Sequence, residues 1–189
     1  MKWFANMKIS RKLLLGFSLV LAVAVALGVI GVINLTSISN SSELMYSQHT
    51  VPLGILTDIT AAFQRVRVNI REIILQTDAT QIAETNQEMT AHREELSTLQ
   101  EEFAKYIDGG DIQESYDSFL ETRKVFGDYV DQVVALSEQN RNAEAIALLS
   151  SEAVETAEQN EQNEIFKMEE LLKSESSSMS AENMTAAQN

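Results

Sequence analysis

A run of 21 uncharged residues, Leu13 to Ile33, constrains this 189-residue chain more than any other feature. As a helix rising about 1.5 Å per residue, the run would be roughly 32 Å long, enough to cross a hydrocarbon layer about 30 Å thick. The twelve residues before it contain four Lys or Arg and no Asp or Glu. Because Lys and Arg are retained on the cytoplasmic side, we expect a cytoplasmic leader over 1–12, a transmembrane helix over 13–33, and an exported remainder.

A cleaved signal peptide is the competing interpretation of the same segment. Two small-residue patterns, Ala22-Val23-Ala24 and Ala24-Val25-Ala26, resemble cleavage sites behind a basic leader. The apolar stretch nevertheless continues to Ile33, beyond the length of about 7–15 residues that is usual for a signal peptide. We therefore favour an uncleaved anchor in the inner, cytoplasmic membrane, with a periplasmic or extracellular domain behind it.

Charge and composition narrow the function of the exported part. Residues 13–189 hold 10 Lys and Arg (14 − 4) against 28 Asp and Glu, a balance of −18 that disfavours nucleic acid and anionic lipid as partners. The chain has no Cys, and His49 and His92 are too far apart for a ligand spacing, so we expect no metal and no cofactor. No nucleophile elbow, phosphate-binding glycine loop or paired-carboxylate signature is present, so we expect no catalytic residue and no enzyme.

The remainder has a helical pattern throughout. One proline and seven glycines leave few helix breakers, and apolar residues recur in steps of three and four. Breaks near Gln76, at Gly109-Gly110 and at 139–141 divide the sequence into helices of about 44, 30, 30 and 48 residues. Residues 34–189 are therefore predicted to be an all-α, antiparallel, up-down four-helix bundle with long first and fourth helices. Pro52 predicts a kink or break in the first helix, or a loop.

Several segments together resemble a known family. They are the leader 6–17 (NMKISRKLLLGF), the exit from the span 30–35 (IGVINL) and the element 50–53 (TVPL). With the helix lengths, they are similar to the amino-terminal part of a bacterial methyl-accepting chemotaxis protein of the four-helix-bundle sensor type. The resemblance covers essentially all 189 residues.

The resemblance implies a homodimer that binds a small molecule in the bundle or at the dimer interface. It also implies that displacement of the fourth helix passes through a second span to a HAMP linker and a kinase-controlling coiled coil. Those parts are missing here, so we expect the chain to recognise a ligand without signalling by itself. The chemotaxis kinase and adaptor would be partners only through the missing C-terminal part.

Three of the ten exported basic residues, Arg65, Arg67 and Arg71, fall within seven positions. None has an acid three or four residues away, whereas the exported lysines do. Arg67 and Arg71 are also four apart, an arrangement that is repulsive unless a carboxylate lies between the two guanidinium groups. This pattern predicts a site for a small carboxylate-bearing ligand, an organic acid or amino acid. Acids on neighbouring helices that pair with the arginines are the alternative.

Family resemblance adds to this site. The Arg67-x-x-x-Arg71 spacing is similar to a pair of ligand-binding arginines in amino-acid-sensing receptors, although the third arginine would fall near Ala62 and is missing unless Arg65 replaces it. Three hydroxyl side chains lie at the same depth as the arginines on the predicted fourth helix. They either complete the site or belong to the ordinary helix surface, and they are Ser150, Ser151 and Thr156.

Two other functions stay open at this point. A membrane-anchored interaction module would bind a partner protein through the polar middle of the fourth helix, where Gln159, Asn160 and Asn163 would line a groove. The same bundle would also serve as the sensor domain of a histidine kinase or cyclase. Arg123 sits in the apolar seam of the third helix, where burial of its charge requires a partner or an exit to solvent.

Overall fold

The protein is helical along nearly its whole described length, residues 7–188 of the computed structural model, with side chains described as far as Thr185. No strand occurs in this part of the chain, in agreement with the predicted all-α fold. The leader residues 1–6 and Asn189 lie outside it. The helices are α2 (Ile9–Met45), α3 (Val51–Ile73), α4 (Ala79–Phe103), α5 (Gly110–Glu138), α6 (Asn142–Leu149) and α7 (Glu152–Gln188).

Contacts group the chain into two compact units, residues 1–44 with 181–189, and residues 45–180. The first unit contains most of α2, an apolar helix none of whose side chains is buried. Its most apolar stretch has a mean hydropathy of 2.8, and it is the one candidate membrane span among the described residues, judged by length and composition alone. A helix that is apolar on all sides needs an apolar surrounding, which a bilayer supplies.

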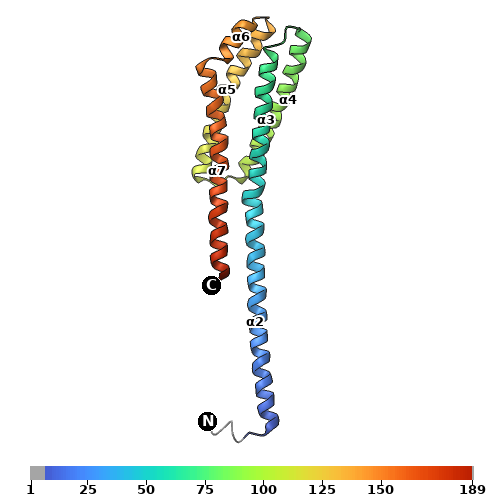
Figure 1. Cartoon of the computed structure of the whole chain (residues 1–189), viewed down its shortest axis with the longest axis vertical. Coiled ribbons are helices and arrows are strands. Elements are labelled where there is room, and N and C mark those ends of the chain that lie inside the picture. Colours follow the sequence, from blue (N-terminus) through green and yellow to red (C-terminus); the bar gives the residue numbers. More distant parts are fainter. Residues whose placement is uncertain (1–6, 189) are drawn as a thin grey trace. The chain divides into compact units, whose positions relative to one another are not determined.

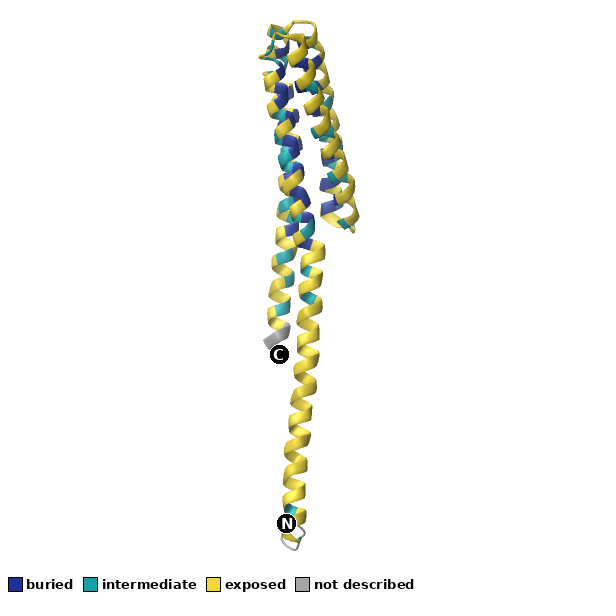
Figure 2. Cartoon of the chain, turned by 90° about the vertical axis from the view of Figure 1, so that its right-hand side faces the viewer, coloured by how far each residue is buried: buried dark blue, intermediate teal, exposed yellow. Residues whose placement is uncertain are grey.

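The second unit is the four-helix bundle. Figure 1 shows α3, α4, α5 and α7 lying alongside one another, with the short α6 between α5 and α7. Hydrogen bonds link α3 to α4 and to α7, and α5 to α7. Most of the buried residues of these helices are apolar, and Figure 2 shows the buried positions in dark blue along the bundle. The largest fully buried side chains include Phe63, Phe103, Phe119 and Met168.

The helical backbone continues past Pro52 without the predicted break or loop. A π-helical turn, η1 (Tyr46–Thr50), precedes α3, and the Val51 N–H donates to the carbonyl oxygen of Tyr46. Pro52 then lies at the start of α3, where a missing backbone N–H costs little. The wider turn therefore lets the chain continue as a helix through a proline.

Turn chemistry explains where α4 and α5 begin. The Asp78 carboxylate accepts hydrogen bonds from the amides of Thr80 (2.8 Å) and Gln81 (3.3 Å), which caps α4. After α4 a 3₁₀ turn, η2 (Ala104–Tyr106), leads to Gly109 and Gly110, whose φ angles are 114° and 67°. Both angles fall in the region that glycine adopts most readily.

The predicted fourth helix differs from the structure in one respect. It is not continuous from Asn142, because the chain breaks at Ser150 and Ser151 between α6 and α7. Ser151 caps the new helix by accepting a hydrogen bond from the Val154 amide (3.4 Å), and the Asn142 side chain donates to the Gln76 carbonyl (2.7 Å). Serine favours such caps over helix interiors, and the break sets the starting register of α7.

Candidate functional site

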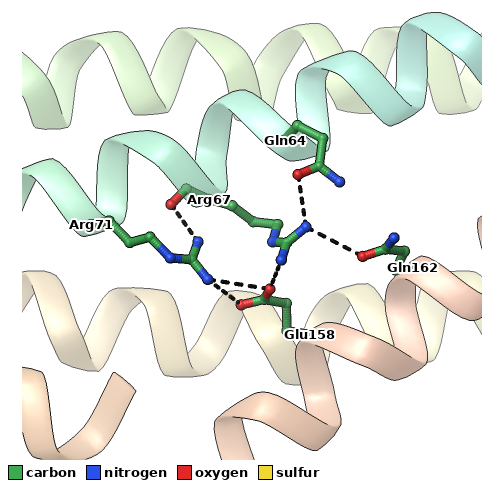
Figure 3. A network of polar contacts seen from close by, with 5 residues as sticks. All are labelled: Gln64, Arg67, Arg71, Glu158 and Gln162. Carbon is green, nitrogen blue, oxygen red and sulfur yellow. Dashed lines mark hydrogen bonds and ion pairs between the residues drawn. The ribbon is translucent and has the colours of Figure 1, made fainter. Parts of the chain in front are cut away.

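A carboxylate lies between the two arginines that the sequence singles out. Arg67 and Arg71 are one turn apart on α3, and both face Glu158 on α7 (Figure 3). Arg67 forms an ion pair with Glu158 through Nη2, while Arg71 Nη2 donates to the two carboxylate oxygens at 3.1 and 3.3 Å. The chain's own acid thus occupies the place predicted for a ligand's carboxylate.

Neutral groups complete this cluster. Arg67 Nη1 donates to the side-chain oxygens of Gln64 (2.7 Å) and Gln162 (3.3 Å), and Arg71 Nη1 donates to the Arg67 carbonyl (2.7 Å). The Arg67 guanidinium also stands 5.5 Å from the centre of the Phe63 ring, in reach of a cation–π contact. We call the five residues Gln64, Arg67, Arg71, Glu158 and Gln162 the arginine cluster.

Charge and access distinguish the members of the arginine cluster. Two arginines against one glutamate leave it with a net charge of +1, and Arg67 Nε is buried without a hydrogen-bond partner. The Glu158 and Arg67 side chains are 12% and 21% exposed, whereas Arg71 is 48% exposed. The arginine cluster therefore has a surplus positive charge and one arm open to solvent.

The other predicted site residues lie elsewhere. Arg65 pairs with Glu95 on α4 at 3.0 Å, and both side chains are about half exposed. Ser150 and Ser151 form the break before α7, and Thr156 is exposed on α7. Within residues 7–185, no hydrogen bond joins these three hydroxyls to the arginines, and Thr156 is exposed although it is only two positions from Glu158.

Sequence reasoning missed Glu158 and Gln162. The apolar seam of α7 passes through its polar middle in steps of four and three, and the positions on it are Val154, Glu158, Glu161, Ile165, Met168 and Leu172. All six are buried. Extending the apolar pattern through these two acids would have predicted that Glu158 faces the core. The polar residues predicted to line a partner groove, Gln159, Asn160 and Asn163, are exposed on the opposite face.

Arg123 is half-buried in α5, as its seam position suggests, and its hydrogen-bond partners are neutral. Its guanidinium donates to the Gln100 side chain, to Ser97 Oγ (2.8 Å) and to the Arg93 carbonyl (3.1 Å). Burial lowers the pKa of Arg123, since a charged group loses hydration there. Among the residues the structure describes, no three His, Asp or Glu side chains are arranged to hold a metal ion.

Comparison with known families identifies the kind of module that carries these residues. The family model of the four-helix bundle sensory module for signal transduction matches residues 6–187, which is nearly the whole chain. No curated protein matches the sequence. The match extends over the apolar helix and the bundle alike, so both α2 and the arginine cluster fall within it.

Proposed function

Because the chain belongs to the four-helix-bundle sensory modules of methyl-accepting chemotaxis proteins, we propose that it is the ligand-sensing part of a chemotaxis receptor. Its ligand is a small carboxylate-bearing molecule, an organic acid or amino acid, bound at Arg67 and Arg71. One observation carries the proposal: two guanidinium groups converge on a single carboxylate, with a positive charge left over. Carboxylate binding between paired guanidinium forks is among the stronger polar contacts that proteins make.

Glu158 acts in this proposal as an internal competitor for the ligand. A ligand carboxylate that takes its place gains the same hydrogen bonds, and Arg71 offers the way in because half of its side chain is exposed. Release of Glu158 removes a tie between α3 and α7, so the ligand favours a different position of α7. A ligand shifts such an equilibrium only if it binds one position of α7 more tightly than the other. Replacement of Glu158 by the ligand carboxylate provides this difference in affinity.

The proposal includes the placement of the chain. Residues 13–33 cross the inner membrane, residues 1–12 stay in the cytoplasm, and residues 34–189 form the sensor on the outer side. The apolar, unburied α2 and the basic residues before it support this orientation.

We also propose that two chains form a homodimer through α3. Val68 and Leu75 are seven residues apart, on α3 and just beyond its end, and expose 62% and 77% of their surface. Apolar residues at this spacing are typical of a helix that packs against a second helix. An output through a chemotaxis kinase and adaptor would need sequence beyond residue 189.

Isothermal titration of the whole chain in lipid nanodiscs tests the ligand site. The probes are succinate, benzoate and L-aspartate, which carry their carboxylates on different carbon skeletons. We expect at least one to bind, the Arg71→Ala variant to lose about tenfold or more in affinity, and the Glu158→Gln variant to gain about tenfold because the competing charge is removed. Arg65→Ala is the matched control and should leave the affinity unchanged, since Arg65 pairs with Glu95 outside the arginine cluster.

Two results would contradict the proposed site. Unchanged affinity in Arg71→Ala would place the ligand elsewhere. Weaker binding in Glu158→Gln would mean that Glu158 holds the ligand instead of competing with it.

A further inference from the structure

A cavity of about 430 Å³, partly open to solvent, lies between the helices of residues 45–180, apart from the Arg67–Arg71 pair. All four long helices line it: Phe63 comes from α3, Leu96 from α4, Arg123, Phe126 and Val130 from α5, and Glu161 from α7. Phe63 and Phe126 meet edge to face with their ring centres 5.8 Å apart, and they give the cavity an apolar wall. Its volume falls within the range of small-molecule sites.

Glu161 is the unusual member of this lining. Its residue surface is 2% exposed, and its Oε2 atom is buried without a hydrogen-bond partner. Burial raises the pKa of Glu161 to about 8, against the opposing effect of Arg123 and Arg93. A buried polar atom without a partner costs free energy, and a ligand that supplies a donor removes that cost.

Among the charged side chains that line the cavity, Arg123 is the partly buried base that has no ion pair with an acid. On α4, Arg93 is paired with Asp131. On α5, Lys124 and Asp128 are exposed to solvent, and on α7 Glu158 is held by the arginine cluster. The cavity side of α3 presents Phe63 and Val66 and no charge. Arg123 alone, among the described residues of this lining, combines burial with neutral partners only.

We propose that this cavity is a second binding site, specific for a zwitterion that carries an ammonium group and a carboxylate on an apolar body. The ammonium group donates to the Glu161 carboxylate, the ligand carboxylate accepts from Arg123, and the apolar body packs against Phe63 and Phe126. A simple amine would leave the charge of Arg123 unmatched, and a simple acid would gain only a hydrogen bond from protonated Glu161 in place of an ion pair. This inference does not depend on the carboxylate site at Arg67 and Arg71.

Binding of the ammonium group requires charged Glu161. At about pH 7 the free protein holds a proton on this carboxyl group, so each ligand bound releases up to one proton to solvent. An acid that instead accepts a hydrogen bond from protonated Glu161 releases none. Proton release therefore separates the two kinds of ligand in a way that affinity alone does not.

Three probes that share a phenyl group on a short carbon chain and differ in their charged groups test the proposal. They are L-phenylalanine, 2-phenylethylamine and 3-phenylpropionate. They are titrated calorimetrically into the whole chain in nanodiscs, in the Arg71→Ala background, with two buffers of different ionisation enthalpy at about pH 7. We expect phenylalanine to bind about tenfold or more tightly than either analogue and to release close to one proton. With Arg71 intact the cavity should bind phenylalanine with the same affinity, and any binding at the arginine cluster would add to it as a separate step. A failure of the arginine cluster would therefore not affect this result.

Variants of Glu161 and Arg123 complete the test. Glu161→Gln keeps the side-chain volume and should lose both the proton release and about tenfold in phenylalanine affinity, with 3-phenylpropionate unaffected. Arg123→Gln should weaken phenylalanine and 3-phenylpropionate alike, and circular dichroism reports whether each variant is folded. Equal affinity for phenylalanine and 3-phenylpropionate in the parent chain, or no binding of any probe up to about 1 mM, would overturn the proposal.

Discussion

At the scale of single residues, two acids in the seam of α7 behave differently although they are three positions apart. Glu158 is matched by two guanidinium groups from α3, whereas Glu161 is buried with an unpartnered oxygen. The difference arises from the neighbouring helix face, because the arginines of α3 reach Glu158 and the apolar side chains of α3 line the space around Glu161. An acid in a seam is thus either part of an ion pair or a group that tends to hold its proton.

The stability of the bundle should depend on pH through Glu161. Its pKa is about 8 in the folded chain and 4.5 in the ordinary case, so between these values the folded chain holds a proton that the unfolded chain has released. The free energy of unfolding therefore falls as pH rises through this window and levels off above about pH 8. Since one pKa unit corresponds to about 1.4 kcal/mol, a loss of a few kcal/mol is expected.

Urea unfolding of the wild type and of Glu161→Gln, at about pH 5 and about pH 9, measures this loss. The variant should lack most of the pH dependence and should be the more stable protein at the higher pH. An identical pH dependence in both proteins would mean that Glu161 is ionised in the folded state.

Removal of Glu158 should destabilise the bundle more than removal of Glu95. Glu158→Ala leaves the largely buried Arg67 without an acid, which costs on the order of 1–3 kcal/mol. Glu95→Ala breaks an exposed pair with Arg65, and such pairs contribute less than about 1 kcal/mol. Chemical denaturation of both variants gives the comparison, and equal losses would show that the arginine cluster contributes no more than a surface pair.

At the scale of helices, local sequence determines some of the ends and tertiary contacts determine the others. The cap at Asp78 and the turn at Gly109 and Gly110 follow from residue type, because each acts on its immediate neighbours. The break at Ser150 does not follow, since serine occurs both in helices and at their caps. The π-helical turn before Pro52 was likewise not predictable, because proline signals an interruption without specifying its form.

Two glycines should respond oppositely to alanine. Gly109 has φ near +114°, a conformation that strains any residue with a Cβ, so Gly109→Ala should destabilise the bundle by about 1 kcal/mol or more. Gly54 lies in α3, where an added methyl group would meet open space, so Gly54→Ala should stabilise by up to about 1 kcal/mol through helix propensity. Thermal unfolding of the two variants distinguishes them. A stabilising Gly109→Ala substitution would contradict the turn conformation described here.

At the scale of the whole molecule, the sensory bundle depends on contacts between residues that are far apart in sequence. The four-residue spacing of Arg67 and Arg71 predicts that they share a partner, but the partner of Arg71 lies 87 positions away. Only the packing of α7 against α3 determines which acid meets them. The fold class, the apolar helix and the family were accessible from periodicity, composition and resemblance. The roles of Glu158 and Gln162 and the cavity beside Glu161 required the three-dimensional arrangement.

The proposed response to a ligand is a change in the distance between α3 and α7, and spin labels measure it directly. The chain has no cysteine, so Asp58→Cys on α3 and Asn163→Cys on α7, both exposed, carry the labels without further changes. Labelled chains are diluted with unlabelled ones in nanodiscs, and pulsed electron paramagnetic resonance gives the distance with and without the tightest-binding acid. We expect a shift on the order of 1–2 Å, and a shift in the same direction in ligand-free Glu158→Gln. An unchanged distance while an Arg71-dependent acid is bound would contradict the account.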